Sequence, residues 1–195
     1  RQRAVGDEHF RALEHVVVAR LGRCAPRAGA DGLHIRPCIG LGAGFVLDSQ
    51  TWKAHPHWAT DLRATEAELA RANHDAIEFI AGLRAEFIGN AAPIVLNGLI
   101  GPRGDAYAPE AAVAASEAEA YHATQIGWLA DTDVDMVTAL TFTQSDEAIG
   151  AVRAAQAAGL PIVVSFTVET DGSLPTGEPL GHAIEAVDAA TSGAA

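Results

Sequence analysis

The sequence predicts an α/β domain built on a parallel sheet, with about four recognisable strand–helix units. From residue 42 onward, short apolar and β-branched runs alternate with longer stretches of helical pattern, as in chains that form βα units. The apolar runs are nearly continuous, which is typical of strands covered on both faces. Pro93 and Pro161 stand at the start of two of these runs, where a missing ladder donor costs least.

The first unit begins with a strand predicted at residues 44–49. After the irregular TWKAHPHW loop, a helix is expected from about Thr65, because the T-x-x-E spacing to Glu68 is that of a capping box. The apolar face predicted for this helix consists of Leu69, Ala72, Ala76, Phe79, Ile80 and Leu83.

The second unit consists of a strand predicted at residues 93–100, the loop GPRGDAY at residues 101–107, and a helix. Ser116 is expected to open this helix, since Glu119 lies three positions later and completes the pattern of a second capping box.

The third and fourth units repeat this order. The third strand is predicted at residues 134–141, and its helix is expected to begin near Ser145 and to end at Gly159, the C′ residue. The fourth strand is predicted at residues 161–169, and a long polar loop separates it from a last helix at about residues 180–190.

Charge is distributed unevenly along the 195 residues, of which 49% are apolar and 19% charged. Residues 1–41 hold seven of the 13 basic residues but only four of the 25 acidic ones, so the formal charge of -12 is concentrated in the remainder. A strongly acidic body without a basic stripe argues against nucleic acid or an anionic membrane as the main partner. The chain has no apolar run of about 18 residues, and its N-terminus lacks the apolar region of a secretory signal, so a cytoplasmic location is expected.

Residues 1–41 are expected to form an atypical, Arg-rich leader with one short helix around residues 10–20. This leader contains seven arginines and no lysine, and we interpret it as poorly ordered or as translated from a shifted reading frame. Residues 42–191 are assigned to the domain and residues 192–195 to a tail.

Polar side chains follow each predicted strand, at the end where parallel α/β folds place their sites. The predicted substrate-binding residues are Asp48, Thr51, Trp52, Arg103, Asp105, Thr141, Glu169 and Asp171. Some have a structural alternative, since Asp48 is also a common turn residue and Asp105 could pair with Arg103 across its turn at little energetic gain. Glu169 is expected at the edge of the apolar interior, where burial would shift its titration.

The Arg-Gly-Asp tripeptide of the GPRGDAY loop leaves three interpretations open. An adhesion motif is disfavoured because no secretory signal is recognised, and a phosphate-binding turn lacks the lysine and hydroxyl of a P-loop. We favour a substrate loop at the end of a strand. His55 and His57, which flank Pro56, are interpreted as residues of a loop rim rather than as metal ligands.

Three stretches, in their order and spacing, resemble the N-terminal half of the homocysteine S-methyltransferase family, which includes the betaine-homocysteine methyltransferases. They are GFVLDSQTWKA, NGLIGPRGDAY and the run from EAEAYHATQIGWLA to ETDGSLPTGEPL, and together they extend over about residues 42–190. Residues 51–54 match the family's T-Y-Q-A-like segment, residues 101–104 its G-P-x-G loop, and residues 169–172 its ETDG segment. The resemblance implies an incomplete TIM (β/α)8-type barrel whose substrate mouth these segments line.

The resemblance also implies a chemistry, in which a cysteine-bound zinc holds the homocysteine sulfur as a thiolate that accepts a methyl group and yields methionine. Zinc is thus the cofactor of the full-length family, and the implied partners are a homocysteine-like thiol and a methyl donor. The family's zinc cysteines come from later segments. Cys24 and Cys38 match neither segment and lack CxxC or histidine spacing, so we expect two free thiols in a reduced compartment. Several members have a glutamate where this chain has Leu140 followed by Thr141.

These departures lead to further expectations. We expect no cofactor in this chain, and we expect a truncated or frame-disrupted methyltransferase that is inactive alone. The uncovered edges of an incomplete barrel predict self-association. The alternative is a non-catalytic, doubly wound α/β domain that binds a small ligand or depends on a partner.

Overall fold

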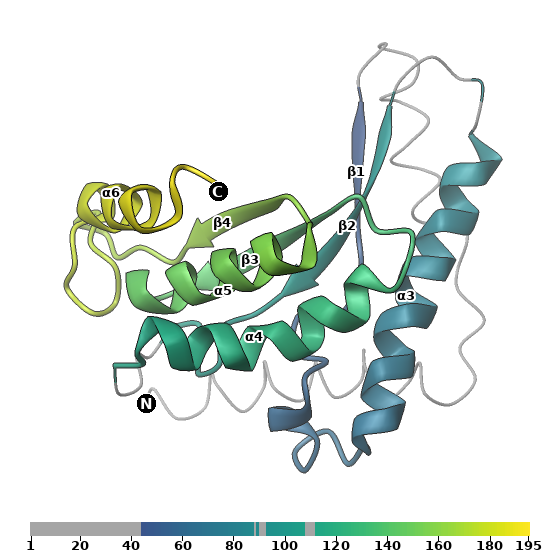
Figure 1. The fold of residues 1–195 in the computed structure, drawn as a ribbon, viewed down its shortest axis with the longest axis horizontal. Helices are drawn as coiled ribbons and strands as arrows, with labels where there is room; N and C mark the ends of the chain where they lie inside the picture. Colours follow the sequence, from purple (N-terminus) through teal and green to yellow (C-terminus); the bar gives the residue numbers. More distant parts are fainter. Residues whose placement is uncertain (1–43, 88, 90–92, 108–111) are drawn as a thin grey trace.

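The computed structural model describes residues 44–87, 89, 93–107 and 112–195, which form a single sheet with helices packed against it (Figure 1). In chain order the elements are β1 (Phe45–Asp48), the 3-10 helix η1 (Pro56–Trp58), α3 (Glu66–Glu86), β2 (Ile94–Ile100), α4 (Ala115–Ala130), β3 (Met136–Phe142), α5 (Ser145–Ala158), β4 (Ile162–Phe166) and α6 (Leu180–Thr191). The predicted leader, its short helix and both cysteines lie outside the described residues.

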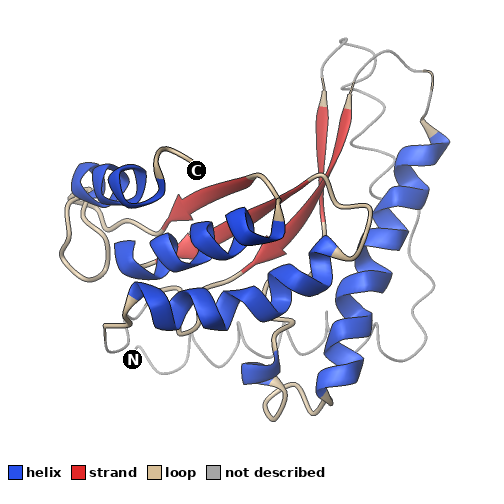
Figure 2. Cartoon of the chain, viewed as in Figure 1, coloured by secondary structure: helices blue, strands red, loops and turns tan. Residues whose placement is uncertain are grey.

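The four strands are all parallel and stand in the sheet in their chain order, β1-β2-β3-β4. A doubly wound sheet reverses its strand order and carries helices on both faces, whereas right-handed crossovers that advance in one direction place every helix on the same face. Figure 2 shows α4 and α5 running side by side along the strands. The predicted series of parallel units of the barrel type is therefore confirmed, and the doubly wound alternative does not fit this topology.

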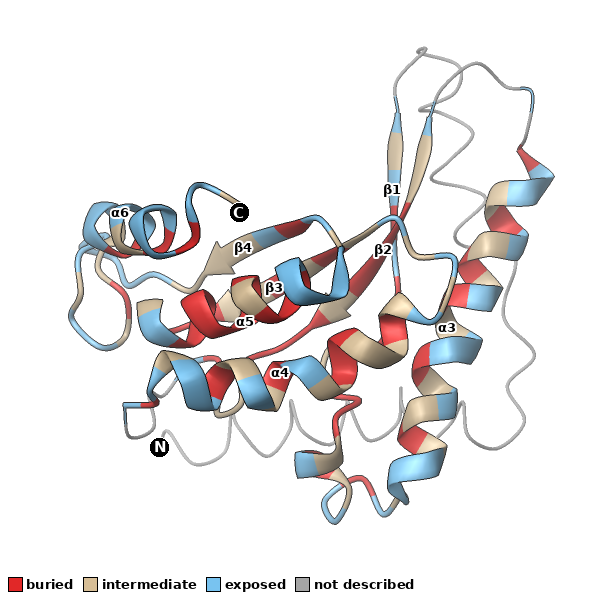
Figure 3. Ribbon diagram, in the orientation of Figure 1, coloured by how far each residue is buried: buried red, intermediate tan, exposed pale blue. Residues whose placement is uncertain are grey.

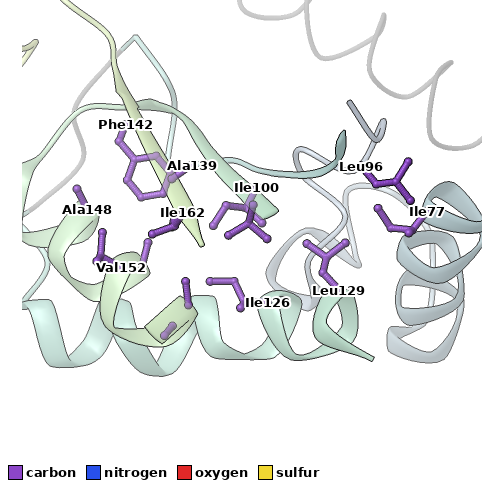
Figure 4. Packing of buried hydrophobic residues seen from close by; sticks show 14 of the residues in the cluster. Ile77, Leu96, Ile100, Ile126, Leu129, Ala139, Phe142, Ala148, Val152 and Ile162 are labelled. Carbon is purple, nitrogen blue, oxygen red and sulfur yellow. The ribbon is translucent and has the colours of Figure 1, made fainter. Parts of the chain in front are cut away.

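One face of the sheet and the helices together form the hydrophobic core (Figure 4). Strand residues of this core include Leu47, Leu96, Ile100, Val137, Ala139 and Ile162, and helix residues include Ile77, Leu83, Ile126, Leu129 and Val152. Burying a side chain of this size stabilises the folded state by about 1.5–3 kcal/mol relative to leaving it exposed. This packing fixes the height of each helix against the sheet, and with it the position of the loops that follow the strands.

The opposite face of the sheet is more open than predicted, because burial alternates along β1 and the first part of β3 instead of being continuous (Figure 3). In β1, Leu47 is buried while its neighbours Val46 and Asp48 are exposed. Since successive side chains of a strand point to opposite faces, Asp48 lies on the face turned away from α3, α4 and α5. In β4, Ile162 is buried whereas its neighbour Val163, which points to the opposite face, is 48% exposed.

An apolar groove of about 320 Å³ lies beside β4, at one edge of the sheet, and is lined by residues that include Val163, Phe166, Val168 and Ile184. No helix among the described residues has the length and apolar character needed to cross a membrane.

Helix ends follow the predictions in two cases and depart from them in one. Thr65 and Glu68 form the predicted capping box of α3, and α5 begins at Ser145 and ends at Gly159, whose φ of 73° is left-handed. The box predicted at Ser116 is wrong, because Ala114 is the N-cap of α4 and makes no side-chain hydrogen bond. Ser116 already lies inside the first turn, and a local sequence pattern did not reveal this earlier start.

The buried stripe of α3 is also rotated slightly from its prediction. Its buried residues are Leu69, Asn73, Ile77, Ile80 and Leu83. Ala72 and Ala76 are only half-buried. Asn73 takes a core position because its amide nitrogen donates to the Ala54 and Leu69 carbonyls, both at 2.8 Å, which satisfies the buried polar group.

Replacing Thr65 with alanine is expected to lower the free energy of unfolding by about 1 kcal/mol, because two contacts at the start of α3 depend on its hydroxyl. The matched control, Ser116→Ala, should change stability by less than about 0.5 kcal/mol since Ser116 is not a cap. Urea denaturation followed by circular dichroism measures both values. Equal losses in the two variants would contradict the assignment of the caps.

Candidate functional site

Two buried hydroxyl side chains extend strand pairing beyond the end of β1. The Ser49 N–H donates to the Asn97 carbonyl at 2.8 Å. The Leu99 N–H then donates to Ser49 Oγ at 3.0 Å, and Thr51 Oγ1 donates to the Leu99 carbonyl at 2.7 Å. Thr51 is 1% exposed. Its hydroxyl proton is therefore used within the protein, and its side chain fixes where the following loop leaves the sheet.

Trp52 connects the end of β1 to the end of β3. Its indole Nε1 donates to the Leu140 carbonyl at 3.2 Å. A Cβ atom at Gly101 would lie 2.7 Å from Nε1 and 2.8 Å from the Trp52 carbonyl oxygen, so only glycine allows this approach. The adjacent Thr141 has a φ of 62°, a left-handed conformation that is strained for a β-branched residue. The β3–β4 register shifts between Ala139 and Phe142, at this same point.

Lys53, the only lysine of the sequence, binds the backbone of the 101–105 loop. Its ammonium donates to the carbonyls of Pro102 and Gly104 and lies 4.4 Å from the ring centroid of Trp58 and 5.0 Å from that of Trp52. The side chain is 7% exposed. A buried ammonium group is stable only when its N–H donors are hydrogen-bonded and its charge is compensated. Here the two carbonyls accept its hydrogen bonds, and the faces of the two tryptophan rings stabilise its charge.

Glu147, at the start of α5, holds the same loop by its backbone. Its Oε1 accepts the Arg103 N–H at 2.5 Å and the Nε2–H of His122 at 3.1 Å. Glu147 is 3% exposed and His122 is 1% exposed. The peptide units between residues 102 and 104 are thus bound by Lys53 through their carbonyls and by Glu147 through an N–H. We call this arrangement of Lys53, Glu147 and His122 the loop clamp.

The side chains of the loop turn toward α4 and toward the loop itself. The Arg103 guanidinium pairs with Glu117 and lies 6.0 Å from the ring centroid of Tyr121. Asp105 Oδ1 accepts the Tyr107 N–H at 2.7 Å, as turn aspartates commonly do. Arg103 is thus tied to a residue of α4 by an ion pair.

His55 is buried between this loop region and α4. Its Nδ1 accepts the His57 N–H at 3.0 Å, so the neutral ring carries its proton on Nε2, which donates to the Tyr121 carbonyl at 2.9 Å. The rings of His55 and Tyr121 stack with their centroids 3.8 Å apart. Burial lowers the pKa of His55 from 6.5 to about 4. The predicted loop rim holds for His57, which is exposed, but His55 is an internal residue.

Asp48 lies on the open face of the sheet and is linked to two strands beside it. The Asn97 side-chain nitrogen donates to Asp48 Oδ1 at 2.7 Å, and Thr138 Oγ1 donates to Asn97 Oδ1 at 3.1 Å. These three side chains form a hydrogen-bonded polar row across β1, β2 and β3.

Glu169 and Asp171 belong to a separate turn. β4 ends at Phe166, three residues before the predicted end, and Glu169 is exposed instead of lying at the edge of the core. The reason is local: the Gly172 N–H donates to the Glu169 carbonyl at 3.0 Å, and Asp171 Oδ1 accepts the Ser173 N–H at 3.0 Å, which closes a turn. Among the described residues, the structure joins neither carboxylate to the other predicted site residues.

A polar cavity of about 260 Å³ lies between the 101–105 loop and the first turns of α4 and α5. Its lining includes Arg103, Asp105, Glu117, Gln144 and Glu147. This volume is close to the lower limit of about 300 Å³ typical of small-ligand pockets. The described part of the chain contains no group of three or more His, Cys, Asp or Glu residues that could hold a metal ion.

Sequence reasoning missed several residues that shape this region. Lys53 carried one signal, because it is the only lysine. Asn97 lies inside an apolar run, where a polar residue is unexpected. Glu147 and His122 had no sequence signal, since 25 positions separate them and only the packing of α4 against α5 brings them together.

Glu147→Ala is expected to lower the free energy of unfolding by about 3 kcal/mol, because one buried donor, on His122, and one part-buried donor, the Arg103 N–H, lose their acceptor. Glu117→Ala is the matched control. It removes the other acidic contact of Arg103 at an exposed position and should cost at most about 1 kcal/mol. Chemical denaturation of both variants tests this, and a loss for Glu147→Ala no larger than that for Glu117→Ala would refute the loop clamp.

Stability should depend on pH through His55. Because the folded-state pKa lies below 6.5, the contribution of the neutral ring is fully present above pH 6.5 and is lost as the pH falls toward about 4. Melting temperatures measured from pH 7 to pH 4 should therefore fall less steeply for His55→Gln than for the unmodified chain. His57→Gln, at an exposed neighbour, should change the slope much less than His55→Gln does. Identical slopes in all three proteins would count against the buried neutral histidine.

Comparison with solved structures identifies the fold. The oxidized form of the homocysteine methyltransferase MmuM from Escherichia coli superposes with a TM-score of 0.67 and 18% identity, covering 90% of this chain and 65% of that chain. The metallated form gives a TM-score of 0.68 and 16% identity, covering 90% of this chain and 68% of that chain. The chain thus spans less than two thirds of the first of these structures. At such identities the likeness establishes the fold, an α/β arrangement of the TIM-barrel type.

Sequence comparison gives the family. No curated protein matches the chain, but the family model described as Homocysteine S-methyltransferase matches residues 27–195. The match begins inside the predicted leader and continues through all four strand–helix units. Because it extends over most of the sequence, the chain belongs to the homocysteine S-methyltransferase family.

Proposed function

We propose that this domain binds homocysteine at the carboxyl ends of its parallel strands and serves a methyl transfer to the homocysteine thiol. The observation that carries the proposal is the family match over residues 27–195, which includes every element whose end forms the candidate site. In folds of this type the loops after the strands form the active site. Here those loops are joined across strands by Thr51, Trp52 and Lys53.

The reaction needs a thiol that has lost its proton. The sulfur then forms a bond to the methyl carbon while the bond between that carbon and the donor breaks, and its electrons stay with the donor. A free thiol has a pKa of about 8.5 and is mostly protonated at neutral pH, so the reaction requires a group that stabilises the thiolate. Zinc would supply this, but the described residues do not form a fitting ligand set. The proposed role of the described part of the domain is therefore substrate binding.

The part of the site described here is suited to a small, polar substrate. The loop clamp fixes the backbone of the 101–105 loop before any ligand binds, because the Pro102 and Gly104 carbonyls and the Arg103 N–H are already hydrogen-bonded. Preorganised loops lower the entropic cost of binding. Acidic side chains border the region, in keeping with a ligand that carries an ammonium group. Self-association through the sheet edges stays a prediction.

The proposal is tested by calorimetry with homocysteine and, as a matched control, homoserine, in which oxygen replaces the sulfur. Saturable binding of homocysteine, at least about tenfold tighter than that of homoserine, is expected. Absence of homocysteine binding would overturn the proposal.

A methyl-transfer assay tests whether the chain is active by itself. The 195-residue chain, supplied with zinc, homocysteine and a sulfonium or quaternary-ammonium donor, is expected to form no methionine detectable by mass spectrometry. Stoichiometric zinc together with methionine formation would show instead that the chain is a complete enzyme by itself.

A further inference from the structure

The polar row on the open face of the sheet points to a ligand-binding role that the family match alone does not assign. We propose that Asp48, oriented by Asn97 and Thr138, binds the α-ammonium group of the thiol substrate. The proposal rests on the proposed function, since it names the part of homocysteine that this face would recognise.

The hydrogen bonds of the polar row run in one direction, from Thr138 through Asn97 to Asp48. Thr138 Oγ1 donates to Asn97 Oδ1 at 3.1 Å, which leaves the amide nitrogen of Asn97 facing Asp48, to which it donates at 2.7 Å. Each group in the row thus fixes the orientation of the next. Asn97 is 3% exposed, and rotation of its buried amide would break both of these hydrogen bonds. Asp48 is therefore presented in one orientation.

The Asp48 carboxylate can accept more hydrogen bonds than the described residues donate to it. An ionised carboxylate offers about four acceptor positions, and among the described residues one hydrogen bond reaches Asp48, on Oδ1. Asp48 is exposed at the end of β1, on the face that α3, α4 and α5 leave open. Among the described residues, no lysine, arginine or histidine forms an ion pair with it. An oriented, accessible anion without an internal counter-ion suits a cationic group of a ligand.

The polar row lies within the sheet rather than in a turn. Asp48 and Asn97 are opposite each other in the β1–β2 register, in the part of a parallel sheet where apolar residues are usual. A turn aspartate would instead accept a nearby backbone N–H, as Asp105 and Asp171 do. Asp48 receives its hydrogen bond from the neighbouring strand, so the turn interpretation does not account for it.

The chemistry of the row favours an organic ammonium over a metal ion. A metal site needs several ligating groups, and no set of three His, Cys, Asp or Glu residues gathers in the part of the chain that the structure describes. An ammonium group needs only one charged acceptor and forms a charge-assisted hydrogen bond with it. Homocysteine carries such a group on its α-carbon.

The experiment compares three thiols that differ by one group each. Homocysteine carries both charged groups, 4-mercaptobutanoate lacks the amine, and 3-aminopropane-1-thiol lacks the carboxylate. Affinities for the full chain are measured by calorimetry. Asp48→Asn should weaken binding of the two amine-bearing thiols at least about tenfold and leave that of 4-mercaptobutanoate within about twofold, because only the ammonium contact is lost.

Two further variants make the test specific. Thr138→Val keeps the shape of the side chain but removes the donor to Asn97, and it should weaken binding of the same two thiols by about two- to fivefold. Asp75→Asn, at an exposed position of α3, removes one negative charge elsewhere and should change none of the three affinities. Melting temperatures confirm that each variant is folded, and Thr138→Val carries the test if Asp48→Asn does not fold.

The outcomes separate the two proposals. Equal weakening for all three thiols, or no change in Asp48→Asn, would overturn the role of Asp48 while binding by the unmodified chain still supports the proposed function. If the unmodified chain bound none of the three thiols, the proposed function itself would fail, and the ammonium site would fail with it.

Discussion

The constraint on which the structure depends is the one-directional advance of its parallel strands. Because β1 to β4 follow one another in the sheet, the crossover helices pack on one face. The helices α3, α4 and α5 therefore leave the other face uncovered. The same constraint brings all four strand ends to one edge. The polar row of Asp48, Asn97 and Thr138 and the bound loop after β2 are both consequences of this arrangement, since each requires side chains from neighbouring strands to meet.

The loop clamp shows how such an edge becomes ordered. A loop with two glycines has a high conformational entropy when unfolded, and turn geometry alone would not determine its path. Lys53 and Glu147 bind the backbone of the loop itself, so its conformation does not depend on the identity of the intervening side chain. The Arg103 side chain is not needed to hold the loop, and it pairs with Glu117 of α4 instead.

Sequence patterns predicted most of the fold, because hydrophobic runs, helix-ending glycine and the capping box of Thr65 are local features. They failed where a distant contact decides the outcome. Ser116 resembles a cap, but α4 begins before it. Glu169 seemed to end a strand, but a turn closed by Asp171 takes it out of the sheet. Within the site, Asp48, Trp52 and Arg103 could be proposed from their positions after strands, whereas the partnership of Glu147 with His122 exists only after α4 and α5 have packed.

The burial of Lys53 has a consequence for the surface of the domain. Since it is the only lysine in the sequence, the exposed side chains of the described residues include no primary amine, and their positive charge comes from arginine and histidine alone. Amine-directed reagents and cross-linkers therefore have one side-chain target, and that target lies between two tryptophan rings beneath the 101–105 loop. Its acylation would report the opening of this loop, which makes Lys53 a natural reporter of local unfolding at the strand ends.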